Sequence, residues 1–95
     1  MDLREIDKRI ATSLLGYNLG KSRPKHYSSN LNQTFELLKK LKRIGKVYSW
    51  EVNSGTSEVL PLMFTFHGEY GSSWTETDYK TLAADICNLL LTRLT

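Results

Sequence analysis

The sequence predicts an α+β fold: a small α/β sandwich with the order ααββα, in which helices cover a central antiparallel β-hairpin. Apolar residues recur at helical spacing towards both ends of the chain and alternate with polar residues in the middle. Ninety-five residues suffice for one domain, so we assign residues 1–95 to a single domain. Because one hairpin is unstable alone, we expect helices on both of its faces and further strands from another subunit.

The first predicted helix spans residues 2–16. Asp2 is suited to cap its start, and Gly16 can adopt the left-handed conformation that ends a helix. Its apolar positions are Leu3, Ile6, Ile10 and Leu14. Residues 16–29, which are rich in Gly, Ser and Asn, are predicted to form a loop.

The second predicted helix begins near Ser29 or Asn30 and ends at Gly45. Asn30 and Gln33 fit a capping box. The apolar stripe comprises Leu31, Phe35, Leu37, Leu38, Leu41 and Ile44.

Two strands are predicted next, at residues 46–52 and 59–67, joined by a turn over residues 53–57. Pro61 cannot donate a ladder hydrogen bond, so it favours an edge position or a bulge for the second strand. Residues 68–76 are predicted to form a loop that carries Tyr70 and Trp74.

The third predicted helix begins near residues 75–77, where Thr75 and Asp78 resemble a capping box. Its apolar face comprises Tyr79, Leu82, Ala83, Ile86, Leu89, Leu90 and Leu94.

The chain shows no secretory signal and no apolar run long enough to span a membrane, so we expect a cytoplasmic protein. Charge is distributed unevenly along it. Residues 21–46 contain eight Lys and Arg residues against one acid, whereas residues 47–95 contain six acids against two bases. The basic block can attract phosphates or the acidic part of a second copy.

The candidate ligand site lies in residues 21–30, just before the second predicted helix. A helix N-terminus attracts anions through its unpaired N–H groups and dipole, and this stretch adds cations and an imidazole. The predicted contacts are phosphate binding by Arg23, Lys25 and His26, base stacking by Tyr27 and Trp74, and a hydroxyl donor from Ser28. A structural alternative stays open, in which Tyr27 packs on the core and Ser29 or Asn30 only caps the helix.

A second basic cluster offers an alternative, nucleic-acid-binding site. Its members are Lys39, Lys40, Lys42, Arg43 and Lys46. Such a cluster can bind a phosphate backbone, but a helix C-terminus also recruits cations for structural reasons. No exposed aromatic residues interleave it, so we expect nucleic-acid binding to be the weaker candidate.

Catalysis and metal binding have little support in the sequence, and we expect no enzyme activity, cofactor or metal. No nucleophile, zinc-protease or phosphate-loop motif is present. His26, His67 and Cys87 would supply only three scattered ligands. Cys87 lies among apolar residues, as is typical of a buried structural thiol.

Three segments, residues 6–17 (IDKRIATSLLGY), 27–41 (YSSNLNQTFELLKKL) and 83–90 (AADICNLL), together resemble the phage ABA-sandwich domain family. In that family a leading helix ends in a glycine-aromatic pair, a Tyr-Ser signature caps a second helix, and an Ala-Ile-Cys-type helix closes the domain. The resemblance implies a phage origin, while most members have no assigned function. Residues 67–77 depart from the family, which usually has a shorter strand and a simpler link there.

The functional hypothesis is a small non-enzymatic phage-type binding protein, a counter-defence factor that sequesters an anionic nucleotide or cyclic nucleotide signal. Sequestration enters by analogy with unrelated small phage proteins. The alternatives are an inhibitor or adaptor that binds a host protein through Tyr70 and Trp74, and a basic nucleic-acid-binding accessory protein. We expect a homo-oligomer in the host cytoplasm and no membrane partner.

Overall fold

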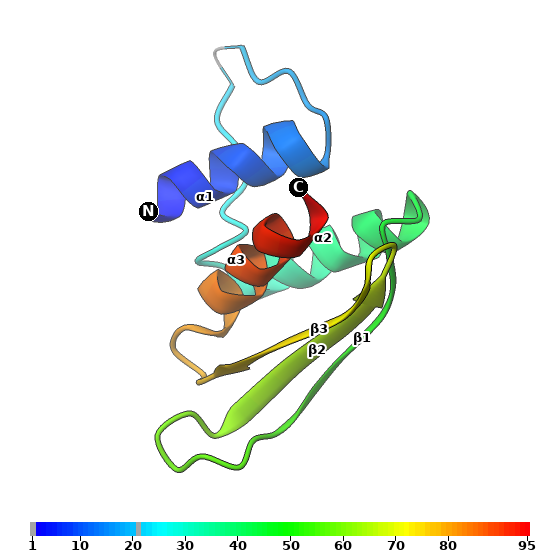
Figure 1. Ribbon diagram of the computed structural model, residues 1–95. Coiled ribbons are helices and arrows are strands. Elements are labelled where there is room, and N and C mark those ends of the chain that lie inside the picture. Colours follow the sequence, from blue (N-terminus) through cyan, green and yellow to red (C-terminus); the bar gives the residue numbers. More distant parts are fainter. Residues whose placement is uncertain (1, 21) are drawn as a thin grey trace.

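The computed structural model describes residues 2–20 and 22–95. Three helical segments and a three-stranded antiparallel sheet follow one another in the order helix, helix, strands, helix, which confirms the predicted α+β class (Figure 1). The elements are α1 (Leu3–Arg9) with the π-helical turn η1 (Ile10–Leu14), α2 (Leu31–Arg43), β1 (Val47–Ser54), β2 (Leu62–Gly68), β3 (Gly71–Thr77) and α3 (Leu82–Leu94).

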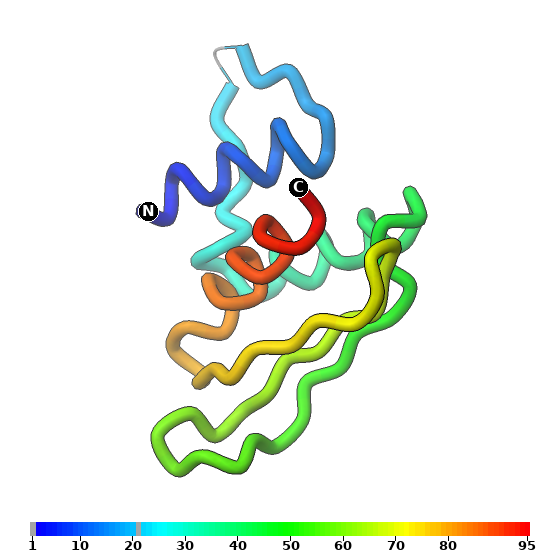
Figure 2. The backbone as a smooth tube through the Cα atoms, in the orientation of Figure 1, coloured from blue at the N-terminus to red at the C-terminus, as the bar shows by residue number. Residues whose placement is uncertain are grey.

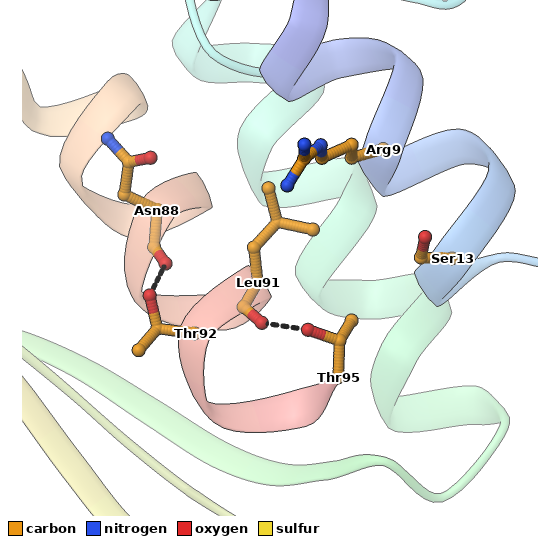
Figure 3. Close-up of a pocket in the computed structure, with 6 residues that line it drawn as sticks. All are labelled: Arg9, Ser13, Asn88, Leu91, Thr92 and Thr95. Atoms are coloured by element: carbon orange, nitrogen blue, oxygen red, sulfur yellow. Dashed lines mark hydrogen bonds between the residues drawn. The ribbon is translucent and has the colours of Figure 1, made fainter. Parts of the chain in front are cut away.

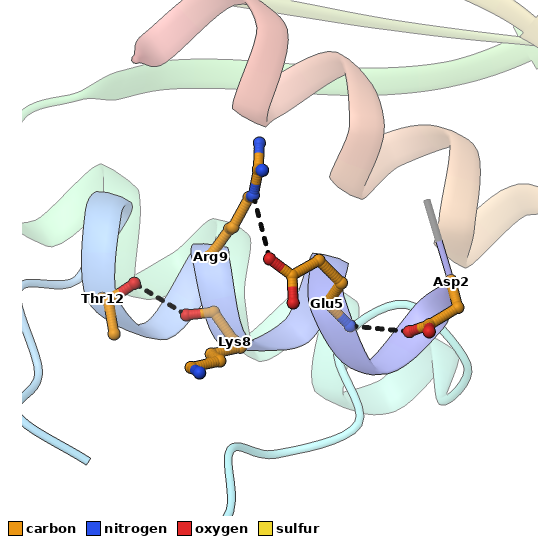
Figure 4. Close-up of polar contacts among 5 residues, drawn as sticks. All are labelled: Asp2, Glu5, Lys8, Arg9 and Thr12. Carbon is orange, nitrogen blue, oxygen red and sulfur yellow. Dashed lines mark hydrogen bonds and ion pairs between the residues drawn. The ribbon is translucent and has the colours of Figure 1, made fainter. Parts of the chain in front are cut away.

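The start of α1 follows the prediction, and so does its apolar face except at Leu3, which lies in the first turn and is 44% exposed. The Asp2 carboxylate accepts a hydrogen bond of 2.9 Å from the Glu5 N–H, as an N-cap should (Figure 4). Ile6, Ile10 and Leu14 are buried, so one apolar face continues from α1 through the wider turn of η1.

The apolar stripe of α2 is narrower than predicted. Asn30 caps the helix by accepting from the Gln33 N–H, but Leu31 and Ile44 are 39% and 56% exposed. Both stand at the helix ends, beyond the neighbouring layers that cover the middle. The buried positions are Thr34, Leu37, Leu38 and Leu41.

The prediction of a two-stranded hairpin is wrong, because residues 71–77 form a third strand. Gly68 pairs with Gly71 across the β2–β3 turn, and Gly71 adopts a φ of +100°, which favours glycine. Polar Ser and Thr residues on β3 hide the strand in the sequence, since alternation with apolar residues is the usual signal. The sheet order is β1-β2-β3, so β2 is the central strand. Pro61 precedes it by one residue, and the edge position predicted for that strand is wrong.

The expectation of helices on both faces of the sheet is also wrong, because the three helices lie on one side of it (Figure 1). This inner face buries Phe64 and Phe66 of β2, and α2 and α3 cover it while α1 lies on those helices, farther from the sheet. The outer face carries Glu51, Thr65 and Trp74 in register across the strands. No described helix packs on this outer face.

Helix α3 begins later than predicted, at Leu82. Asp78 caps the turn before it by accepting hydrogen bonds from the Lys80 and Thr81 N–H groups at 2.8 and 2.9 Å. Tyr79, which was predicted on the helix, precedes it and is 80% exposed. The rest of the predicted face is correct, with Ile86 and Leu90 fully buried.

Candidate functional site

A groove lies between α1 and the segment that leads into α2. Its volume is about 670 Å³. Its lining residues are Arg4, Asp7, Lys8, Arg23, Pro24 and His26. Three cations and an imidazole therefore come together from two segments that are distant in the sequence.

Helix α1 supplies one wall of the groove. Arg4 and Lys8 are four residues apart and so lie on one helical face, next to Asp7. Lys8 and Arg9 leave α1 on opposite sides, and Arg9 points towards α3 (Figure 4). Of the three described cations Arg4, Lys8 and Arg9 on α1, Arg4 and Lys8 therefore line the groove and Arg9 does not.

The segment of residues 22–28 supplies the other wall and is pinned to α1 by a buried polar contact. The chain returns across α1 after its excursion beyond η1 (Figure 2). Asp7 Oδ1 accepts hydrogen bonds from the Ser28 N–H at 2.8 Å and the Ser28 Oγ–H at 2.7 Å. Asp7 and Ser28 are 3% and 2% exposed, so these bonds are shielded from water.

Two of the predicted ligand contacts are structural residues. Tyr27 is 2% exposed, and burial raises the pKa of its hydroxyl. Its carbonyl accepts from the Thr34 hydroxyl, which ties it to α2. A ring buried to this degree offers no face to a base. The predicted stacking by Tyr27 and hydroxyl donation by Ser28 are therefore corrected to packing and anchoring.

The other predicted ligand contacts do not all lie at the same place in the structure. Arg23 and His26 line the groove, and the His26 N–H donates to the Gln33 side chain at the start of α2. Lys25 is not a lining residue, and its Nζ lies 3.9 Å from a Glu36 carboxylate oxygen. Trp74 is on the outer face of the sheet, the layer farthest from α1, so the structure does not bring it to the groove. Lys21, in the predicted stretch, lies outside the described residues.

Sequence reasoning missed Arg4, Lys8 and Asp7 as site residues. A signal for Asp7 was present, because a carboxylate stands between Leu3 and Ile10 on the apolar stripe of the first helix. A charge at such a position needs buried partners or an access to water.

The second basic cluster is largely engaged within the molecule. Lys40 Nζ lies 3.2 Å from the Tyr17 hydroxyl and above its ring, and Lys42 Nζ lies 5.9 Å from the Trp50 ring centroid. Lys46 Nζ donates to the Leu14 carbonyl at 3.0 Å, at the end of η1. Among the five cations, Lys39 and Arg43 are exposed and make no such contact in the described part of the chain. Structural roles thus account for much of the cluster.

His26, His67 and Cys87 do not form a cluster in the described structure. Cys87 is buried in α3, and burial raises the pKa of its thiol, which keeps it in the unreactive protonated form. Within residues 2–20 and 22–95, no three His, Cys, Asp or Glu side chains gather closely enough to hold a metal ion.

A second pocket, of about 400 Å³, lies between α1 with η1 and the end of α3 (Figure 3). Its lining residues are Arg9, Ser13, Asn88, Leu91, Thr92 and Thr95. The Thr92 and Thr95 hydroxyls donate to the carbonyls of Asn88 and Leu91, and so are occupied by their own helix. Arg9 is the one charged side chain among the described residues that line it, so this pocket is the weaker candidate for an anion.

Comparison with known proteins shows a fold and no activity. No family model matches the chain, and no curated protein matches it. A solved structure of a phage protein from Bacillus cereus ATCC 14579 superimposes with a TM-score of 0.71 over 98% of this chain and 87% of that chain, at 19% sequence identity. No described helix is long and apolar enough to cross a membrane. The chain therefore shares its fold with a phage protein.

Proposed function

We propose that this chain is a small phage-type binding protein that holds a phosphate-bearing ligand in the groove between α1 and residues 22–28. The observation that carries the proposal is the convergence of Arg4, Lys8, Arg23 and His26 on that groove. Guanidinium and ammonium groups make charge-assisted hydrogen bonds to phosphate oxygens, and two arginines offer bidentate contacts.

Binding without turnover is the mode of action that the groove supports. Its described lining contains no Ser, Thr or Cys side chain that a neighbouring base would activate. A protein that only binds acts by lowering the free concentration of its ligand. With a nucleotide or cyclic nucleotide signal as ligand, this action amounts to counter-defence by sequestration.

The first test is a calorimetric titration with inorganic phosphate and ribose 5-phosphate. Arg4→Ala and Arg23→Ala should each weaken binding about tenfold, since a hydrogen bond to a charged group contributes about 1.5–3 kcal/mol. Arg43→Ala, which removes an exposed arginine at the end of α2, is the matched control and should leave affinity unchanged. Equal affinities for all four proteins would move the ligand out of this groove.

Thermal unfolding against nucleotides, cyclic dinucleotides and ADP-ribose then addresses the ligand class. A ligand present at 100 times its dissociation constant adds about 2.7 kcal/mol to stability, which raises the melting temperature by several degrees in a domain of this size. Trp74→Ala should not change any such shift, because Trp74 lies on the outer face of the sheet.

A second candidate, from a different class, is an adaptor or inhibitor that binds a host protein through the outer face of the sheet. The observation in its favour is that Trp74 is 60% exposed on this face, while Tyr70, on the turn between β2 and β3, is 74% exposed and lines a pocket beside the end of α3. Aromatic anchors of this kind are enriched at the centres of protein interfaces. A flat response to every small ligand, with a stable complex in host extract that Trp74→Ala abolishes, would favour this candidate. Self-association through the same face would appear instead as a concentration-dependent mass in sedimentation.

A further inference from the structure

We propose that Asp7 contacts the ligand and selects a nucleoside phosphate whose base presents N–H donors, guanine being the best match. This inference rests on the proposed function, and it adds to it the part of the ligand that is not phosphate. It also gives a role to a buried carboxylate that a simple anion site would not contain.

The two carboxylate oxygens of Asp7 are in different situations. Oδ1 accepts both hydrogen bonds from Ser28, whereas no described residue donates to Oδ2 or forms an ion pair with it. Among the described residues, no fully enclosed side-chain oxygen or nitrogen lacks a partner. Oδ2 therefore keeps contact with the groove that Asp7 lines.

An oxygen in this situation favours a donor from the ligand. An ionised carboxylate only accepts hydrogen bonds, and leaving Oδ2 unpaired is costly once a ligand displaces water from the groove. Arg4, Lys8 and Arg23 line the same groove but lie beyond the 4.0 Å of an ion pair with Asp7. The carboxylate is thus left available, while the cations are left available for the phosphate.

The same carboxylate repels a phosphate placed against it. A ligand is best held when its phosphate lies on the cations and a neutral, donor-bearing part lies on Asp7. The groove has room for both parts, because about 670 Å³ is within the range of pockets that hold drug-sized ligands.

Guanine meets this requirement most fully among the common bases. Its N1–H and its exocyclic 2-amino group stand side by side, so both can donate to the one oxygen that Ser28 leaves free, Oδ2. Hypoxanthine keeps the N1–H but lacks the amino group, so inosine 5′-monophosphate (IMP) differs from guanosine 5′-monophosphate (GMP) by one donor. Ribose 5-phosphate has the phosphate and no base.

The test is a set of titrations of the full chain with GMP, IMP and ribose 5-phosphate. The wild-type protein should bind GMP about tenfold or more tightly than IMP, and IMP more tightly than ribose 5-phosphate. Asp7→Asn retains an oxygen for the two Ser28 donors and replaces the free acceptor by an amide N–H₂. This variant should lose the preference for GMP and bind ribose 5-phosphate at least as well as the wild type, since a negative charge has gone.

Glu5→Gln is the matched control. It neutralises another carboxylate on α1 that pairs with Arg9 outside the groove, and it should keep the wild-type order of affinities. If Asp7→Asn fails to fold, the order of the three ligands on the wild-type protein still decides the matter.

Two results would overturn the inference, and they differ in what else they overturn. Equal affinities for GMP and ribose 5-phosphate, both weakened by Arg23→Ala, would remove the role of Asp7 and leave the phosphate site standing. Absence of binding by all three ligands would remove the proposed function together with the inference.

Discussion

The groove beside α1 and the outer face of the sheet are both polar surfaces, but they are built in different ways. The groove joins two distant segments through the buried contact of Ser28 with Asp7, and its exposed groups are mostly cationic. The outer face follows from strand alternation alone, and its charged residues are the acids Glu51 and Glu76 beside Trp74. A pre-arranged basic hollow suits a small anion, whereas a flat acidic and aromatic face suits a protein partner.

The largest change in the free energy of unfolding is expected when substitutions on the inner and outer faces of β2 are compared. Phe64→Ala on the inner face should lower the free energy of unfolding by about 3–5 kcal/mol, because Phe64 is fully buried and leaves a cavity. Thr65→Ala, one residue away on the outer face, should change it by no more than about 0.5 kcal/mol. Urea unfolding measures both. Similar losses at the two positions would mean that another layer covers the outer face in solution.

A smaller effect is expected from the contact that builds the groove. A double-mutant cycle of Asp7→Ala and Ser28→Ala should give a coupling energy of about 0.5–3 kcal/mol, since the bonded atoms are shielded from water.

The pair His67 and Ser72 on the outer face provides the matched cycle. Their side chains lie 2.5 Å apart but are exposed, so their coupling should be below about 0.5 kcal/mol. Denaturant unfolding of the six single and double variants checks both values. Equal couplings would contradict the distinction between a pinned groove and an unsupported face.

The smallest effect on stability is expected from Asp78. Its carboxylate holds the turn between β3 and α3, as the carboxylate of Asp7 holds the segment that lines the groove. Hydrogen bonding, chiefly from the Thr81 N–H, holds the pKa of Asp78 below its ordinary value of 3.8. Its contribution to stability is therefore full above that value and is lost as pH falls through the lower pKa of the folded state.

Melting temperatures of the wild type and Asp78→Asn measured between pH 7 and pH 2 test this. The variant should melt at a lower temperature near neutrality, and the difference should vanish at the acid end. Glu58→Gln, which alters an exposed acid on the link before β2, should show no such convergence. A constant difference across the range would assign the effect to something other than the charge of Asp78.

The helices were predictable because their signals are local. Ile6, Ile10 and Leu14 share a face whatever they pack against, and Asn30 caps α2 through its own next turn. Strand β3 was not predictable from alternation, because its inner face consists of Ser73, Thr75 and Thr77 in place of apolar residues.

The candidate site was predictable in part. Arg23 and His26 were found because they stand at a helix N-terminus, which attracts anions, and because helix capping does not account for them; both line the groove. Arg4 and Lys8 were not found, since their role depends on which segment packs against α1. That packing is decided by a bond between residues 21 positions apart, and no local pattern encodes it.

The uncovered face of the sheet makes the molecule tolerant of redesign. The outward strand positions are Ser49, Glu51, Asn53, Met63, Thr65, His67, Ser72, Trp74 and Glu76. Their side chains contribute nothing to the fully buried core on the other side. A library that varies these positions would present a diversified patch on an intact scaffold. The basic groove at the opposite end would stay unchanged, so ligand binding there would report whether each variant has folded correctly.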